Sequence, residues 1–209
     1  MCLKEKKINT YKILSIILKY PTEQLIKYVS YFFNVLKQEK LLVDNTIEKL
    51  GLLFTYLSNT DLTKLQEGYV SIFDRQKAFS LYLFEHIYGD SGDRGQAMVD
   101  LKNVYITSNL SLISTELPDF IPLFLEYLSL LSVEESSRLL SEPINIFSIL
   151  GRRLKQINNL YWVVFFALEE LAFVKADNMV VQNALRMEKK GFKLVEEEID
   201  KEWEEKSTF

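Results

Sequence analysis

Apolar residues recur at three- and four-residue spacing along nearly the whole chain. This spacing places them on one side of a helix with 3.6 residues per turn, so the pattern is typical of successive amphipathic helices. Residues that interrupt helices are scarce, because the 209 residues include only seven glycines and four prolines. A protein built from strands needs many tight turns, which depend on glycine, proline and asparagine. We therefore predict an all-α fold, a single-domain bundle of several helices.

Several of the expected helix ends are marked by particular residues. The first helix is expected over Thr10–Tyr20, and it stops at Pro21. Pro21 suits the first turn of the next helix, because its missing N–H would have no partner there in any case. Asp44 and Asp61 are placed to act as N-caps of the two helices that follow, since aspartate oxygens accept hydrogen bonds from exposed backbone N–H groups.

Similar signals mark helices in the second half of the chain. Pro122 falls in the first turn of an expected helix, and Ser132 and Glu135 have the spacing of a capping box. The longest apolar run, Leu160–Leu168, has nine residues. A membrane-spanning helix needs about 20 apolar residues, so this run predicts a buried helix of a globular domain.

The end of the chain differs in composition from the rest. Residues 187–209 contain eight acidic and five basic residues and few apolar ones. This composition predicts a folded helical domain over residues 1–186, followed by an acidic and mobile extension over residues 187–209. With Cys2 as the only cysteine and His86 as the only histidine, neither a disulfide framework nor a structural zinc site is expected, and the predicted location is the cytoplasm.

The stretch "LFEHIYGDSGDRGQAMVDL", residues Leu83–Leu101, is the most polar part of the central region. Gly89 is placed as the residue after a helix, and Asp93 as the N-cap of the next one. The stretch therefore predicts a helix, a short turn and a second helix. Four apolar side chains are expected on the inner face of the first helix and the segment before it: Phe79, Leu83, Phe84 and Ile87.

Negative charge is concentrated around this stretch. Residues 85–135 contain nine acidic residues against Arg94 and Lys102, a net charge of −7. Such a region repels nucleic-acid phosphates and attracts a basic peptide. The alternative is a set of acidic helix faces that do no more than contact water.

Three kinds of chemistry fit the stretch poorly. Its glycine spacing matches no phosphate-binding loop, and its aspartates lack the spacing of a calcium loop. Catalysis by a histidine base would require His86, and a lone histidine near a helix end is more often a structural hydrogen-bonding group. No catalytic residue, no metal ligand and no bound cofactor are therefore predicted.

A recognition surface fits the stretch better. Acidic side chains in loops and at helix starts are expected to face outward, namely Asp90, Asp93, Glu116 and Asp119. Aromatic side chains alternate with acidic ones in the next helix, namely Phe120, Phe124 and Tyr127. Arginine pairs with carboxylates and stacks on aromatic rings, so this combination predicts binding of a peptide that carries both basic and apolar residues.

Three segments together carry a resemblance to a known family. They are "YVSIFDR" (Tyr69–Arg75), "SLYLFEHIYGDSGDRGQAMVDL" (Ser80–Leu101) and "ELPDFIPLFLEYLS" (Glu116–Ser129), and the terminal "IDKEWEEKSTF" agrees with them. They resemble the NarJ family of nitrate reductase delta-subunit chaperones, within the wider TorD-like group. The resemblance implies an all-helical cytoplasmic assembly chaperone that is not an enzyme.

The resemblance also implies a partner and a binding site. The partner is the catalytic subunit of respiratory nitrate reductase, bound through its basic and apolar N-terminal segment. The chaperone keeps that subunit competent for insertion of the molybdenum cofactor and the iron–sulfur clusters before it docks at the membrane, and it is expected to act as a monomer. The candidate contact residues are Glu85, His86, Asp90, Asp93, Arg94, Gln96, Asp100, Glu116, Asp119, Phe120 and Glu126.

Three positions depart from the family pattern. Family members commonly carry histidine after the "ELPD" aspartate, where this chain has Phe120, and also where Tyr82 and Tyr88 stand. A contact made by that histidine in relatives must therefore be absent here or be replaced by ring stacking. Two alternatives remain open, a chaperone for a sulfoxide or N-oxide reductase and a helical hydrolase that uses His86.

Overall fold

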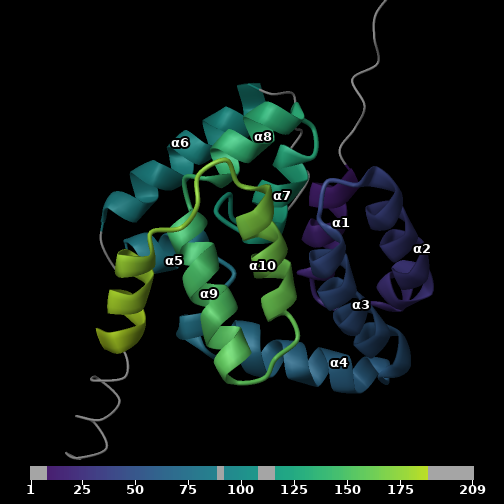
Figure 1. The fold of residues 1–209 in the computed structure, drawn as a ribbon. Coiled ribbons are helices and arrows are strands. Elements are labelled where there is room, and N and C mark those ends of the chain that lie inside the picture. The colour runs from purple at the N-terminus through teal and green to yellow at the C-terminus, as the bar shows by residue number, and fades with distance from the viewer. Residues whose placement is uncertain (1–8, 89–91, 108–115, 188–209) are drawn as a thin grey trace, which may run out of the picture.

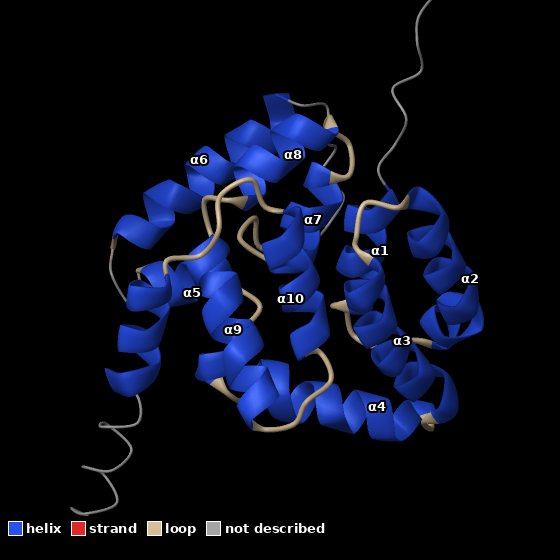
Figure 2. Ribbon diagram, viewed as in Figure 1, coloured by secondary structure: helices blue, strands red, loops and turns tan. Residues whose placement is uncertain are grey.

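The protein is built from helices joined by short connections. A computed structural model describes residues 9–88, 92–107 and 116–187, and within these ranges every regular element is helical (Figures 1 and 2). The prediction of an all-α fold is confirmed. None of the helices in the described ranges is long and apolar enough to cross a bilayer. The α-helices are α1 (Asn9–Ile17), α2 (Glu23–Glu39), α3 (Asp44–Asn59), α4 (Leu62–Tyr69), α5 (Leu83–Ile87), α6 (Asp93–Thr107), α7 (Ile121–Leu128), α8 (Val133–Leu140), α9 (Ile144–Gln156) and α10 (Trp162–Leu171).

The helices bury their apolar faces against one another around one continuous core. Helix α1 packs on α2 and α7, α2 packs on α3, and α10 packs on both α3 and α9 (Figure 1). Burying a leucine or phenylalanine side chain stabilises a fold by about 1.5–3 kcal/mol, so these faces hold the bundle together. The most deeply buried side chains include Leu14, Ile17, Leu50, Leu53, Leu57, Phe147 and Phe165.

The apolar run Leu160–Leu168 contributes most of α10, as predicted for a buried helix. Val163, Val164 and Phe165 have no exposed surface. A glycine on α9 allows the two helices to approach closely, because a Cβ atom at Gly151 would lie only 3.0 Å from the Cβ atom of Phe165. Side chains of α10 therefore fill the space that a larger residue at position 151 would occupy.

Helix ends whose caps are local agree with the sequence patterns. The Asp61 carboxylate accepts a hydrogen bond from Thr63 N at 2.9 Å and caps α4. Ser132 and Glu135 form the predicted capping box at the start of α8. Pro122 lies in the first turn of α7. Each of these signals acts within a few residues, which explains why the sequence reveals it.

Three predicted helix starts are wrong. Asp93 is the first residue of α6 and not its predicted N-cap. The N-cap of α2 is Thr22, and Pro21 lies before it rather than in the first turn. Asp44 is the first residue of α3 and not its cap, since Val43 holds the cap position without a side-chain hydrogen bond. The exposed groups of this helix end are bound instead by Glu170 of α10, which accepts hydrogen bonds from Val43 N and from the hydroxyl of Thr46. A partner so distant along the chain leaves no local signal.

A widened turn follows α4. Residues Val70–Asp74 form a single π-helical turn, which contains one residue more per turn than the regular helix predicted through Tyr69 and Phe73. The Tyr69 hydroxyl donates a hydrogen bond to the carbonyl oxygen of Leu18 at 3.0 Å. The Phe73 ring packs edge-on against Tyr161, with ring centroids 5.2 Å apart. This turn therefore anchors the end of α4 to both α1 and α10.

The central polar stretch forms two helices, α5 and α6, as predicted, although Gly89 and Asp90 between them lie outside the described residues. Helix α5 is only five residues long. Phe79 and Leu83 are buried, but Ile87 is 50% exposed and does not join the inner face that was predicted for it. The chain is helical again over residues 178–187, and the predicted acidic extension lies outside the described residues from position 188 on.

A candidate peptide-binding cleft

Two segments about 35 residues apart in the sequence are joined by a short antiparallel bridge. The bridge pairs Tyr82 with Phe120, and it is formed by hydrogen bonds from Leu83 N to the oxygen of Asp119 (3.0 Å) and from Ile121 N to the oxygen of Leu81 (2.8 Å). The aromatic rings of Tyr82 and Phe120 lie side by side, with centroids 5.2 Å apart. The polar stretch and the "ELPDF" segment thus form one structural unit.

Asp119 lies inside this unit, and the prediction that it faces outward is wrong. Its side chain is 0% exposed, and its Oδ2 atom accepts a hydrogen bond from Phe84 N at 3.0 Å. The Arg94 guanidinium lies 3.8 Å from the same oxygen. Burial raises the pKa of Asp119 above its ordinary value, although the Phe84 N–H and Arg94 oppose this effect. Asp119 therefore supports the start of α5 from within and is not available to a partner.

Glu85, His86 and Arg94 also serve internal contacts. Arg94 lies 3.7 Å from the Glu85 carboxylate, so this arginine faces two acidic groups at once. The His86 Nε2 atom lies 2.8 Å from the carbonyl oxygen of Ser80. Because a carbonyl oxygen can only accept, Nε2 carries a proton and donates it. Burial lowers the pKa of His86, because a buried site disfavours the charged form of the ring. This effect favours the uncharged ring, which is typical of a structural histidine.

A cleft of about 680 Å³ opens beside the bridge. Four separate segments supply its walls: the connection between α1 and α2, the end of α4 with the π-turn, the segment before α5, and residues 116–126. We call it the acidic cleft, and its lining residues are Lys19, Tyr20, Thr22, Tyr69, Phe73, Asp74, Leu81, Tyr82, Glu116, Phe120, Leu123 and Glu126.

Two groups of aromatic rings line the acidic cleft. The Tyr20 ring packs edge-on against Tyr69 (5.6 Å between centroids), and Tyr69 packs against Phe73 (4.9 Å). The Tyr82–Phe120 pair forms the other aromatic surface. Such faces bind apolar side chains through buried area and attract cations through the ring electrons.

Three carboxylates against one lysine give the acidic cleft a negative charge. Glu116 is exposed and accepts a hydrogen bond from the Tyr82 hydroxyl at 3.0 Å. Burial, with the Glu116 hydrogen bond as the second cause, raises the pKa of Tyr82 to about 12, so its hydroxyl stays protonated. Asp74 is exposed at the end of the π-turn.

Glu126 differs from the other two acids because lysines of α1 and of its end already contact it. Lys19 Nζ lies 3.0 Å from its carboxylate, and Lys12 contacts the other oxygen. Burial alone would raise the pKa of Glu126, but the hydrogen bonds from Lys12 and Lys19 outweigh burial and lower it. Glu116 and Asp74 are the two exposed carboxylates among the residues that line the acidic cleft.

The structure brings together only some of the predicted contact residues. Glu116, Phe120 and Glu126 line the acidic cleft. Asp93, Gln96 and Asp100 lie on the exposed surface of α6, where Gln96 donates a hydrogen bond to Asp100 at 2.9 Å. Asp90 lies outside the described residues.

Two aromatic residues were wrongly expected at the surface. Phe124 and Tyr127 are buried, and Tyr127 packs on Tyr105 with ring centroids 5.0 Å apart. Conversely, the sequence interpretation missed Tyr20, Asp74 and Tyr82 as cleft residues. Asp74 and Tyr82 lie inside the segments that carry the family resemblance. Their place in those segments was the only sequence signal that could have marked them as site residues.

The fold and the acidic cleft together give an all-helical protein with a surface cleft lined by aromatic and acidic side chains. Among the described residues, no group of three or more His, Cys, Asp or Glu side chains is placed to hold a metal ion. The Nε2 atom of His86 is engaged with the backbone carbonyl of Ser80.

Comparison with known proteins places the chain in a family. The profile of the nitrate reductase delta subunit family matches residues 40–166, and the chain belongs to this family. The chain is 37% identical over 193 residues to the nitrate reductase molybdenum cofactor assembly chaperone NarJ of Escherichia coli K12, covering 92% of this chain and 81% of that protein. It is 33% identical over 195 residues to the probable chaperone NarW of the same organism, covering 93% and 80%.

A solved structure shows the same fold. A protein assigned as a redox enzyme maturation protein from Archaeoglobus fulgidus superposes with a TM-score of 0.57 at 20% identity, over 80% of this chain and 94% of that one. The curated relatives above are assembly chaperones and not enzymes, and the prediction that this chain is not an enzyme is confirmed on that ground.

Proposed function

We propose that this chain is a cytoplasmic assembly chaperone for respiratory nitrate reductase. It binds the N-terminal segment of the catalytic subunit as a monomer. It keeps that subunit competent for insertion of the molybdenum cofactor and the iron–sulfur clusters until the subunit docks at the membrane. The family membership and the chaperone relatives support the general role.

The acidic cleft is the observation that carries the proposed binding mode. A segment with basic and apolar residues would place its apolar side chains against the accessible rings of Tyr20, Tyr82 and Phe120. Its positive charges would lie beside Glu116 and Asp74. The cleft volume of about 680 Å³ accommodates several side chains of such a segment but no folded domain. Recognition of a short extended or helical segment is the mode that fits these dimensions.

A peptide titration tests this proposal. A synthetic peptide of roughly the first 30 residues of the catalytic subunit is titrated into the full chain at low salt by calorimetry. Replacing Glu116→Lys together with Asp74→Lys is expected to weaken binding by at least about tenfold, since about 1.4 kcal/mol corresponds to a factor of ten. Peptides from sulfoxide and N-oxide reductases, titrated in parallel, test the alternative client class.

A matched control separates the acidic cleft from general charge effects. Glu48 is exposed on α3 and lies outside the cleft. Combined with Glu67→Lys on α4, the Glu48→Lys substitution changes the net charge by the same amount as the cleft variant. Absence of binding to the unaltered chain would refute the proposed role. Equal weakening in both variants would refute the proposed site.

A further inference from the structure

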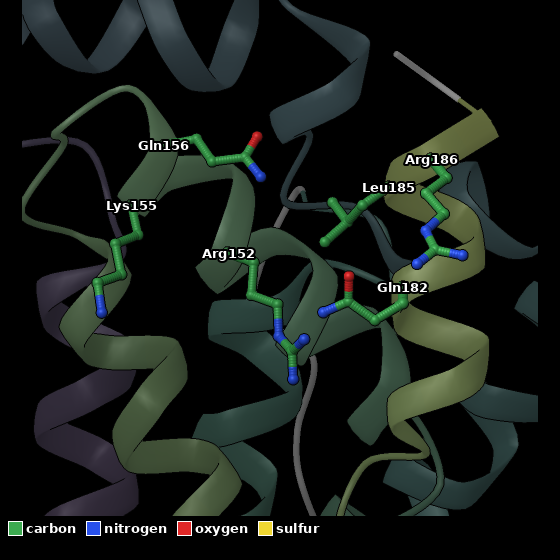
Figure 3. Close-up of a pocket in the computed structure, with 6 residues that line it drawn as sticks. All are labelled: Arg152, Lys155, Gln156, Gln182, Leu185 and Arg186. Carbon is green, nitrogen blue, oxygen red and sulfur yellow. The ribbon is translucent and has the colours of Figure 1, made fainter. Parts of the chain in front are cut away.

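A second pocket, of about 360 Å³, lies between α9 and the helical segment 178–187 (Figure 3). It shares no lining residue with the acidic cleft, and its charge has the opposite sign. We call it the basic pocket. Three cationic side chains, two amides and one leucine line it, and no carboxylate does: Arg152, Lys155, Gln156, Gln182, Leu185 and Arg186.

Within the described ranges, none of Arg152, Lys155 and Arg186 has a carboxylate within ion-pair distance. The Arg152 guanidinium donates a hydrogen bond to the neutral amide oxygen of Asn178 at 2.8 Å. The Lys155 ammonium lies over the Trp162 ring, 4.7 Å from its centroid.

One acidic residue, Glu169 of α10, does face Arg152. Burial raises the pKa of Glu169, although Ser148, Arg152 and Lys175 oppose this effect. Glu169 does not line the basic pocket, but it lines a neighbouring cavity together with Arg152 and Lys155. The basic pocket itself is bordered by three cationic side chains and by no carboxylate of the described residues.

The arrangement of these side chains suits a particular ligand chemistry. Arg152 and Gln156 extend from α9, and Gln182 and Arg186 extend from the facing helix, so polar groups from both helices border the same space (Figure 3). Guanidinium groups bind phosphate oxygens through paired hydrogen bonds, and the glutamine amides add further donors. Buried Leu185 supplies an apolar surface for the remainder of a ligand.

We propose that the basic pocket binds a small phosphate-bearing molecule, with Arg152 and Arg186 holding the phosphate from opposite sides. A phosphate ester carries up to two negative charges, which two arginines match. The pocket volume lies at the lower end of the range of roughly 300–1,000 Å³ found for small-molecule sites, so the ligand is small. This site is independent of the proposed binding of a client segment.

Calorimetric titration of the full chain with inorganic pyrophosphate tests the assignment. Binding is expected in low-salt buffer, and the variant Arg152→Gln/Arg186→Gln is expected to weaken it at least tenfold. The matched control is Arg75→Gln/Arg138→Gln, which removes two exposed arginines outside the pocket and is expected to bind as the unaltered chain does. Binding of the client peptide is expected to be the same in all three proteins.

Several results would overturn the assignment. One is the absence of pyrophosphate binding, and another is an equal loss in the control variant. Equally tight binding of citrate, a tricarboxylate, would show a site for any polyanion. Tighter pyrophosphate binding by the full chain with Glu196→Gln, Glu197→Gln and Glu198→Gln would assign the pocket to the chain's own acidic segment instead.

Discussion

The Asp119 carboxylate accepts a hydrogen bond from the backbone N–H of Phe84 at 3.0 Å, and this contact joins two parts of the family motif inside the protein. The donor belongs to the first turn of α5, a helix of five residues that has no side-chain cap of its own. An aspartate 35 residues further along the chain thus completes a short helix beside the acidic cleft.

Replacing Asp119→Ala should therefore destabilise the fold. The buried Phe84 N–H would lose its acceptor, at a cost of about 1–3 kcal/mol in the free energy of unfolding. Asp119→Asn keeps an acceptor and should cost less. Urea unfolding followed by circular dichroism measures both, with Asp100→Ala on the exposed face of α6 as a control that should change stability by less than about 0.5 kcal/mol. Equal stabilities of Asp119→Ala and Asp100→Ala would contradict the internal role of Asp119.

A second prediction concerns the start of α3. Glu170→Ala removes the acceptor for Val43 N and the Thr46 hydroxyl, so it should lower the free energy of unfolding by about 1–2 kcal/mol. Asp44→Ala should cost about 0.5 kcal/mol, because Asp44 acts only through its charge near the helix end. Chemical unfolding of the two variants compares these values directly. A larger loss of stability from Asp44→Ala than from Glu170→Ala would support the original prediction that Asp44 caps α3.

The stability of the protein should fall in mild acid because of His86. Its pKa is lowered in the folded state by burial, and Arg153 adds to this effect while the Ser80 hydrogen bond and Glu85 oppose it. The unfolded chain therefore binds a proton more readily, and stability is lost as the pH falls from about 6.5 towards the folded-state pKa. Above that window the contribution is fully present.

The variant His86→Gln tests this dependence. Glutamine can still donate to the Ser80 carbonyl oxygen but does not titrate. The loss of unfolding free energy between pH 7.5 and pH 5.5 should be smaller in His86→Gln than in the unaltered chain. Urea unfolding at the two pH values gives the difference, and the same slope in both proteins would show that His86 does not cause the loss.

Ring stacking should replace the family's histidine at position 120. Phe120→Ala removes one wall of the acidic cleft and the partner of the Tyr82 ring, so it should weaken binding of the client peptide about fivefold or more. Phe120→Tyr keeps the ring and should bind nearly as well as the unaltered chain. Phe173, which is 72% exposed and outside the cleft, supplies the control Phe173→Ala. Calorimetric affinities that show no difference between Phe120→Ala and Phe173→Ala would exclude the ring as a contact.

The fold was predictable because its signals are local. Helical periodicity depends on neighbours three and four residues away, and the caps at Asp61 and Ser132 act within three residues. The run Leu160–Leu168, which supplies most of α10, contains no charged residue, so its sequence alone predicts burial. These features depend on the sequence within one or two turns, so they can be recognised before the chain is folded.

The candidate site was only partly predictable, because regional charge does not reveal pairing. The count of −7 over residues 85–135 treats all acids alike, whereas Arg94 faces Glu85 and Asp119, and two lysines from the first helix and its end contact Glu126. The lysines are more than 100 residues away in the sequence. Tyr20 joins the cleft in the same way, through packing on Tyr69. Only the tertiary structure distinguishes an internal carboxylate from one that a partner can reach.

The π-helical turn at Val70–Asp74 has a consequence for how this family can change in length. Removing one residue there would restore a regular turn and rotate the following chain by about 100° relative to α4. Phe73 would then leave Tyr161, and Asp74 would no longer stand at the mouth of the cleft. The extra residue of this turn therefore keeps Phe73 against Tyr161 and Asp74 in the acidic cleft at the same time. An insertion or deletion here would break one of these two placements, whereas an ordinary surface loop would tolerate it.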